Sequence, residues 1–175
     1  MITTATRLLC AAVTLLCLAT AAHAQDYPKR PITMIVPFAA GGASDVIARV
    51  VAEQMASALG QTIVIENIAG AGGSTALTRA ARAEADGYTI AIGNAGTSAA
   101  SYTIYPLLPF KPDAFAPIAM VAKTFGIVAL RKDFPAKDLK EFIAYAKSNP
   151  GKVNLGHAGV GSSNFLICKE FHSGC

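Results

Sequence analysis

Short apolar runs alternate along the chain with longer stretches whose apolar residues recur at helical spacing. The pattern predicts a strand over residues 32–36, a helix that Ser44 caps and Gly60 ends, and a second strand over residues 62–66. Ala-rich residues 74–85 predict another helix, and residues 88–92 predict a third strand. This β-α-β-α order is typical of an α/β fold with an open, mostly parallel sheet.

The second half of the chain starts a new unit of the same kind. Residues 106–117 are Pro-rich and are expected to form a loop. Short strands are predicted over residues 118–121, 127–130 and 153–155, a helix over residues 138–147, and a last helix capped by Ser162 or Ser163. Because the pattern changes after about residue 124, we predict two lobes, residues 25–124 and residues 125–175.

The first 24 residues have the pattern of a cleaved signal peptide. Arg7 precedes an apolar run over residues 8–20, and the small residues Ala22 and Ala24 flank His23 before Gln25. The run is shorter than the ~20 residues that a membrane anchor needs. We therefore expect residues 1–24 to direct export and the mature chain to start at Gln25.

The net charge argues against a nucleic-acid partner, and the cysteine and histidine spacings argue against a disulfide and a metal site. Cleavage would remove Arg7 and leave a net charge of about +3, with basic residues scattered singly or in pairs, which does not indicate a nucleic-acid partner. Cys168 and Cys175 lie seven residues apart on a predicted helix, too far for an unstrained disulfide. Because no Cys or His pair has the spacing of a metal site, we expect no metal.

Three Gly-rich turns at strand ends are candidates for a ligand-binding site. They cover residues 37–45, 67–74 and 157–163, and each leads into a predicted helix whose first backbone N–H groups favour an anion. No basic side chain lies inside these turns except His157 at the edge of the last. A fourth strand-end loop, residues 94–98, offers side-chain donors. Because parallel strands end at one edge of a sheet, the four segments predict a site that holds a small anion through neutral groups.

Two features of these turns have a structural as well as a functional interpretation. Gly41, Gly42, Gly72, Gly73 and Gly161 let the backbone approach a ligand closely, or they simply make tight turns. Asp45 complements the dipole of its helix, or it orders the Gly41–Gly42 loop or accepts a hydrogen bond from a ligand. Both alternatives stay open at the level of sequence.

Motifs for catalysis and nucleotide binding are absent from the sequence. There is no Gly-x-Ser-x-Gly elbow, no phosphate-binding loop ending in Gly-Lys-Ser/Thr, and no Gly-x-Gly-x-x-Gly fingerprint. His157 with Ser162 or Ser163 could act as base and nucleophile, although a His at a strand end is more often a hydrogen-bonded structural residue. We expect no cofactor.

Taken in order, the turn motifs resemble those of a known family. They are Pro31-Ile32-Thr33, Val36-Pro37-Phe38-Ala39-Ala40-Gly41-Gly42-Ala43-Ser44-Asp45, Val64-Ile65-Glu66-Asn67, Gly70-Ala71-Gly72-Gly73, Asp86-Gly87-Tyr88-Thr89, Phe115-Ala116-Pro117-Ile118, Pro150-Gly151-Lys152 and Gly159-Val160-Gly161-Ser162-Ser163. This set is similar to the Bug family of tripartite tricarboxylate transporter substrate-binding proteins. The resemblance covers nearly all of the predicted mature chain.

The resemblance implies a two-lobed periplasmic protein with a type II periplasmic-binding-protein-like fold. Such a protein would be a non-enzymatic monomer that closes on a small carboxylate and presents it to membrane permease subunits. Carried onto this sequence, the ligand contacts would be Phe38, Ala39, Gly41, Gly42, Asp45, Asn94, Thr97, Ser98, Gly161, Ser162 and Ser163.

The sequence also departs from the family pattern. Family members continue beyond the point that corresponds to Phe171, so the second lobe is expected to be incomplete here, and Phe165 stands where the family commonly has a His. Two other hypotheses therefore remain beside solute binding. The chain could be a small exported α/β serine hydrolase that uses His157, or a truncated remnant that binds nothing.

Overall fold

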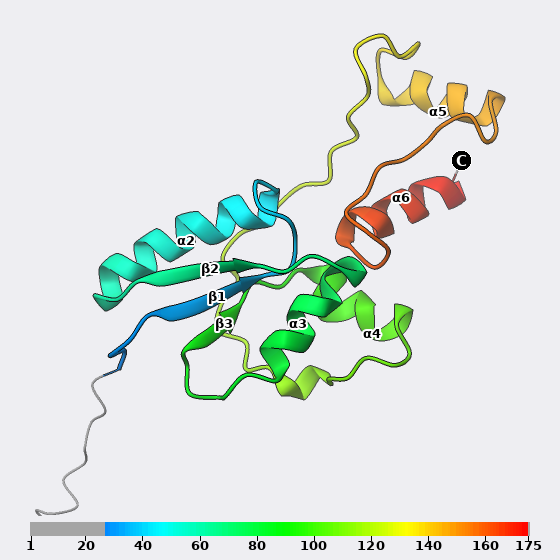
Figure 1. Cartoon of the computed structure of the whole chain (residues 1–175). Coiled ribbons are helices and arrows are strands. Elements are labelled where there is room, and N and C mark those ends of the chain that lie inside the picture. The colour runs from blue at the N-terminus through cyan, green and yellow to red at the C-terminus, as the bar shows by residue number, and fades with distance from the viewer. Residues whose placement is uncertain (1–26, 175) are drawn as a thin grey trace, which may run out of the picture.

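The computed structural model describes residues 27–174, and side chains as far as residue 170. Strands β1 (Ile32–Val36), β2 (Ile63–Asn67) and β3 (Thr89–Ala91) form a parallel sheet in the order β2-β1-β3 (Figure 1). The register places Val36 opposite Asn67. All three strands therefore end at the same edge of the sheet, as the β-α-β pattern predicts.

Two helices cover the sheet. Helix α2 (Ala43–Leu59) contacts β1 and β2, and helix α3 (Ser74–Ala81) contacts β1 and β3. The connections run from β1 to β2 and from β2 back across β1 to β3, so right-handed crossovers place α2 and α3 on opposite faces. Figure 1 shows the two helices flanking the strands.

Strand alternation builds the core. Met34 and Val36 of β1 pack with Ala48 and Ala52 of α2, and all four are buried. Ile35 is fully buried as well and points to the other face, as the period of a strand requires. Because β1 is covered on both faces, its sequence is almost continuously apolar.

The remaining helices are short or lie away from the sheet. They are η1 (Ala71–Gly73), η2 (Gly96–Ala100), α4 (Ser101–Ile104), η3 (Pro112–Ala114), α5 (Leu139–Ser148) and α6 (Ser163–Gly174). The segment after β3 is thus largely helical and not the loop expected over residues 94–98. Helix α3 ends at Ala81, four residues before the predicted end.

The helix ends confirm some of the predicted caps. Gly60 adopts a left-handed conformation after α2, with φ 65°, and Ser162 Oγ accepts a hydrogen bond from the Phe165 N–H at the start of α6. The prediction that Ser44 caps α2 is wrong, because the helix begins at Ala43, two residues before the start that a Ser44 cap implies, and Gly42 is its N-cap. Asp138 caps α5 through its contact with the Glu141 N–H at 2.8 Å.

The strands predicted over residues 118–121, 127–130 and 153–155 do not form. These stretches have no regular secondary structure and no ladder partners among the described residues, and the Ile118 and Ile127 side chains are 82% and 86% exposed. An apolar run becomes a strand only when a neighbour pairs with its N–H and C=O groups. Residues 126–130 and 154–156 line one small pocket together with residues of α5 and α6, but they form no strand pairing with each other.

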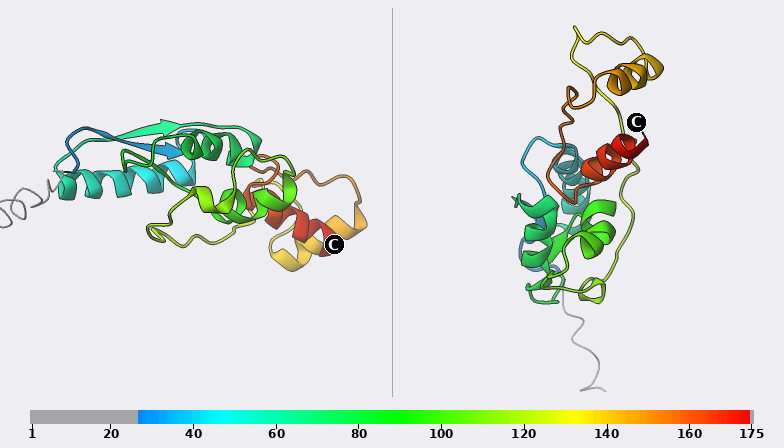
Figure 2. Two further views of the ribbon diagram at one scale, coloured as in Figure 1. Left: turned by 90° about the horizontal axis from the view of Figure 1, so that it is seen from below. Right: turned by 90° about the vertical axis from the view of Figure 1, so that its right-hand side faces the viewer.

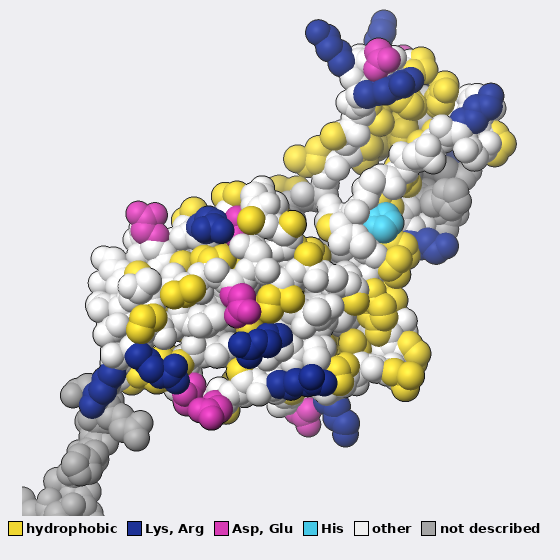
Figure 3. Space-filling view, viewed as in Figure 1, with side chains coloured by type: hydrophobic (Ala, Val, Ile, Leu, Met, Phe, Trp, Pro, Cys, Tyr) yellow, Lys and Arg dark blue, Asp and Glu magenta, His cyan; other side chains and the backbone are white. Residues whose placement is uncertain are grey.

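The described chain is elongated, with two units. The sheet unit, residues 27–115, holds β1–β3 with α2–α4, and the C-terminal unit, residues 116–174, holds α5 and α6 beyond the carboxyl edge of the sheet (Figures 1 and 2). Lys and Arg side chains are scattered over the face in Figure 3, with no continuous basic stripe. Among residues 27–174, no helix has the length and apolar character to span a bilayer. The predicted signal peptide and Cys175 lie outside the described residues.

Candidate functional site

The turn after β1 is organised around a buried carboxylate. Asp45, in the first turn of α2, is only 2% exposed, and its Oδ2 accepts the Gly41 N–H at 2.8 Å and Arg49 Nε at 2.9 Å. Its Oδ1 accepts Asn67 Nδ2 at 3.0 Å, and the same amide nitrogen donates to the Phe38 carbonyl at 3.1 Å. Asp45 therefore orders the turn from Phe38 to Gly41, which is one of the roles considered for it above.

These donors stabilise the ionised form of Asp45. Hydrogen bonds from Arg49, the Gly41 N–H and Asn67, in that order, lower the pKa of Asp45 from 3.8 to about 2, against the opposing effect of burial. Gly41 has φ 82° and open space around the position of a Cβ, so this glycine is needed for its backbone conformation.

A second group forms where the segment after β3 meets the start of α6. The Asn94 side chain accepts the Thr97 N–H at 3.1 Å, and Thr97 Oγ1 accepts the Asn94 N–H at 2.9 Å. Ser163 Oγ accepts the Gly96 N–H and donates to Asn94 Oδ1, both at 3.1 Å. Ser98 adjoins this group, with its Oγ 3.4 Å from Thr97 Oγ1. Thr97 is fully buried, so the contact is an interior feature of the molecule.

The turn before α6 also packs tightly against the turn after β2. A Cβ added at Gly72 would lie 2.1 Å from the Val160 carbonyl oxygen, and one at Gly96 would lie 2.5 Å from the Ser163 nitrogen. Tyr105 donates its hydroxyl to the Val160 carbonyl at 2.6 Å. Gly72 and Gly96 thus allow the turn after β2 and the segment after β3 each to meet the turn before α6 backbone to backbone.

The structure therefore brings the predicted site residues together in two groups. Asn94, Thr97 and Ser98 lie with Gly161, Ser162 and Ser163, whereas Phe38, Ala39, Gly41 and Gly42 are gathered with Asp45. No hydrogen bond among the described residues joins one group to the other. Both groups follow carboxyl ends of the strands, and Gly73 lies between them, where an added Cβ would meet Pro37 on one side and Thr97 on the other.

The two groups differ in electrostatics. The start of α2 already holds the Asp45 carboxylate, while the first turns of α3 and α6 carry no acidic residue. The partial positive charge of a helix N-terminus favours an anion, and a carboxylate already at that end opposes a second one. The group at the start of α6 is thus the more favourable place for an anion.

The proposed pair of a histidine base and a serine nucleophile is not assembled. His157 Nδ1 accepts the Gly159 N–H at 3.0 Å, and the ring lies edge-on to Phe165. Ser162 Oγ caps α6 and Ser163 Oγ contacts Asn94, and within residues 27–170 neither hydroxyl is hydrogen bonded to His157. Over the same residues, no cluster of three or more His, Cys, Asp or Glu side chains could hold a metal ion.

Four further residues complete the two groups: Arg49, Asn67, Gly96 and Tyr105. Asn67 and Gly96 lie in segments that the sequence singled out but were not among the predicted contacts, and Arg49 and Tyr105 lie outside those segments. The spacing of Asp45 and Arg49, four residues apart in one helix, was a usable signal for an ion pair. Asn67 could have been found from the parallel pairing that places it beside Val36. Tyr105 had no local signal, because its partner lies 55 residues away.

Comparisons with known proteins give a consistent result. The sequence model described as "Tripartite tricarboxylate transporter family receptor" matches residues 47–175. A UPF0065 protein from Bordetella pertussis is 46% identical over 157 residues, covering 89% of this chain and 48% of that protein. The chain spans about half the length of the curated relatives it matches.

Solved structures agree with the sequence relatives. The periplasmic binding protein BugD is 38% identical, with a TM-score of 0.74 over 85% of this chain and 50% of that chain. MatC from Rhodopseudomonas palustris, solved with bound malate, is 40% identical, with a TM-score of 0.74 over 84% of this chain and 50% of that chain. The α/β arrangement predicted from the sequence is therefore that of periplasmic binding proteins, represented here over about half their length.

Proposed function

Because the chain belongs to the tripartite tricarboxylate transporter receptor family, we propose that it captures a small carboxylate in the periplasm and presents it to the permease subunits of a transporter of that type. It would act as a monomer, by binding and without catalysis or a cofactor. Residues 1–24 would serve as the export signal.

The observation that carries this proposal is the contact between the segment after β3 and the start of α6. The groups that meet there are neutral hydrogen-bonding groups: the Asn94 amide, the Thr97 and Ser163 hydroxyls, and backbone amides. A carboxylate is well matched to several neutral donors near a helix N-terminus. The malate-bound relative supports a small carboxylate as the ligand class.

The predicted residues would then divide into two roles. Asn94, Thr97, Ser98, Gly161, Ser162 and Ser163 would surround the ligand's carboxylate, which takes over hydrogen bonds that these residues now make with one another. Phe38, Ala39, Gly41 and Gly42 would bound the other end of the ligand, where Asp45 fixes their geometry. A second negative group would be less favourable near Asp45 than near α6.

The proposal is tested by thermal unfolding of the chain recovered from the periplasm after expression with its own first 24 residues. Malate, succinate, citrate and adipate would be added in turn at millimolar concentration, with succinamide as an uncharged control. A carboxylate present at 100 times its dissociation constant should stabilise the fold by about 2.7 kcal/mol. Absence of a shift with every carboxylate would overturn carboxylate binding by this chain.

A pair of variants locates the site. Asn94→Ala removes a side chain at the proposed carboxylate position, and Asn149→Ala removes an amide at the end of α5, away from it. We expect the ligand-induced shift to be lost in Asn94→Ala and kept in Asn149→Ala. Equal shifts in both variants would place the ligand elsewhere.

A further inference from the structure

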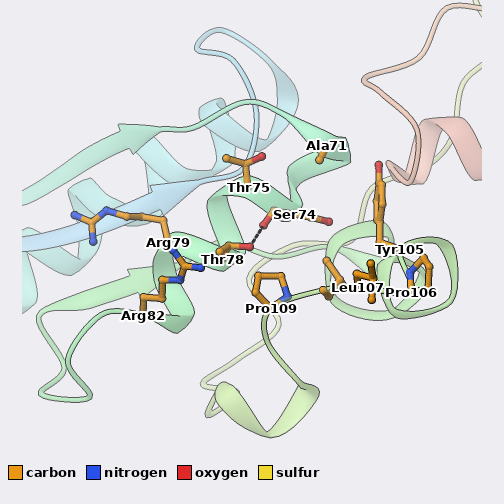
Figure 4. A pocket seen from close by; sticks show the side chains of 11 residues that line it. Ala71, Ser74, Thr75, Thr78, Arg79, Arg82, Tyr105, Pro106, Leu107 and Pro109 are labelled. Carbon is orange, nitrogen blue, oxygen red and sulfur yellow. Dashed lines mark hydrogen bonds between the residues drawn. The ribbon is translucent and has the colours of Figure 1, made fainter.

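A cavity of about 590 Å³ lies in the sheet unit outside the two groups described above. One wall is the side of α3, and the other is the segment that follows α4, residues 105–109 (Figure 4). Its volume falls within the roughly 300–1,000 Å³ of small-molecule sites. None of the residues assigned to the carboxylate site lines it.

The cavity changes character along its length. Pro106, Leu107, Leu108 and Pro109 make one side largely apolar, and the Leu107 side chain is 92% exposed. Figure 4 shows Arg79 of α3 and Arg82, which follows the end of that helix, at the opposite end from Tyr105 and Pro106. An occupant that matches both ends has an apolar body and a charged head.

The charged end is formed by Arg79 and Arg82. Both side chains line the cavity, and neither forms an ion pair with another described residue. Arginine presents a planar set of donors that suits a carboxylate, sulfonate or phosphate. An anionic group at this end of the cavity would therefore face two guanidinium groups that have no ion-pair partner among the described residues.

Ser74 supplies an independent observation that points to a ligand. The residue is only 4% exposed and lines the cavity, and its Oγ is the one buried side-chain oxygen or nitrogen of the described residues without a hydrogen-bond partner. In Figure 4 its side chain points from the start of α3 toward Tyr105, across the space between the two walls. A buried hydroxyl left unpaired costs free energy that a bound polar group would recover.

We propose that the cavity between α3 and residues 105–109 is a second ligand site, which takes an organic anion with an apolar body. The anionic group lies at Arg79 and Arg82, the apolar body lies against Leu107 and its neighbours, and Ser74 hydrogen bonds to a polar atom of the ligand. The site is separate from the proposed carboxylate site, so one can bind without the other.

The test is an NMR titration of the ¹⁵N-labelled chain with octanoate, using 1-octanol as the uncharged analogue and malate as the anion without an apolar body. Octanoate should shift the amide signals of residues 74–82 and of Tyr105, Leu107 and Leu108. Octanol should bind at least about tenfold more weakly, because it lacks the charge that the arginines select. Malate should leave these signals in place, whatever it does to residues 94–98 and 161–163.

Variants separate the contributions of the residues. Arg79→Gln/Arg82→Gln should weaken octanoate binding by about tenfold or more, while Arg131→Gln, a matched change in the C-terminal unit, should leave it unaltered. Ser74→Ala should weaken binding of 8-hydroxyoctanoate, whose terminal hydroxyl can pair with Ser74, and should leave octanoate binding unchanged. It should not lower the thermal midpoint, because it removes a hydroxyl that pairs with nothing in the folded chain. The same spectra would show whether a variant that no longer binds has also unfolded.

Three results would overturn the proposal. Octanoate could fail to shift the signals of residues 74–82, octanol could bind as tightly as octanoate, or the arginine variants could bind octanoate unchanged. Because malate is titrated in parallel, failure of this site and failure of the proposed carboxylate site are distinguished within one experiment.

Discussion

At the scale of single residues, Asp45 is the side chain on which the β1 turn depends. It is a buried carboxylate with three donors: the Gly41 N–H, Arg49 and Asn67. Removing Asp45 or one of its donors leaves a buried polar group unpaired. The free energy lost by leaving that group unpaired exceeds the free energy that the hydrogen bond contributed. The turn is therefore sensitive to substitutions at Asp45 and at residues that touch no ligand.

The low pKa of Asp45 predicts acid sensitivity. The pKa of Asp45 is about 2 in the fold, below the ordinary 3.8, so ionisation of this carboxyl stabilises the fold. The stabilisation is fully present above pH 3.8 and is lost as the pH falls through about 2. Thermal midpoints should therefore be higher for the wild type than for Asp45→Asn at pH 6, and the two should converge as the pH approaches 2. Asp133→Asn, at a side chain that is 77% exposed, should show no such convergence. A constant difference between wild type and Asp45→Asn would contradict the assignment.

Asp45 could be singled out from local sequence, whereas the role of Asn67 could not. Asp45 follows two glycines at the start of a predicted helix, which is a local pattern. The role of Asn67 depends on the pairing of β2 with β1, which brings its amide to the Phe38 carbonyl from 29 residues away. Local patterns identify the residue types at a turn, and only the register identifies their distant partners.

At the scale of elements, the start of α6 joins the C-terminal unit to the sheet unit. Its two serines act differently: Ser162 Oγ caps the helix, and Ser163 Oγ contacts Asn94 and Gly96. The cap could be expected from sequence, because Ser is favoured there. The hydrogen bonds of Ser163 could not be expected, because its partners Gly96 and Asn94 lie 67 and 69 positions away in the sequence.

The two serines predict two distinguishable variants. Ser162→Ala should destabilise α6 by about 1 kcal/mol through loss of its cap. Ser163→Ala should leave α6 intact and remove its link to Asn94. Hydrogen exchange would show faster exchange at residues 165–168 in the first variant and at residues 96–98 in the second. The same exchange pattern in both variants would refute this division of roles.

Glycine at position 72 is required for the contact between the two turns. Gly72→Ala combines an unfavourable φ of 60° with a clash against the Val160 carbonyl, so the turn before α6 should move away and exchange at residues 160–163 should increase. Gly41→Ala, where φ is 82° but the space is open, should cost only about 1 kcal/mol and leave that exchange unchanged. If both variants increased the exchange equally, the contact would not depend on Gly72.

The failed strand predictions show what an element needs beyond its own residues. Residues 118–121 and 127–130 have the apolar, β-branched composition of strands, as do residues 32–36. Only residues 32–36 have strand partners on both sides, β2 and β3. Composition therefore predicted the strands of the sheet unit well and the two helices of the C-terminal unit as well, but the strands predicted for the C-terminal unit were wrong, because pairing is a property of the whole sheet.

At the scale of the whole molecule, stability is unevenly distributed. The core of Met34, Val36, Ala48 and Ala52 lies wholly within the sheet unit, whereas Phe142 is the one buried large apolar residue of the C-terminal unit, over the side chains described. The side chains of Ile118, Met120, Phe125 and Ile127, in the first part of the C-terminal unit, are mostly exposed. Segments with few buried contacts open first. The lobe boundary predicted near residue 124 falls in this weak region.

Limited proteolysis tests that boundary. Phe125 is 91% exposed in a segment without regular structure, while Phe142 is 1% exposed within α5, so chymotrypsin should cut after Phe125 first. Because the core lies within residues 27–115, the released N-terminal fragment should still unfold cooperatively. Phe125→Ser should slow the first cut, and Phe110→Ser, at a side chain 7% exposed, should not slow it. Cleavage after Phe142 at the same rate, or a fragment that no longer melts cooperatively, would mean that the two units fold only as one.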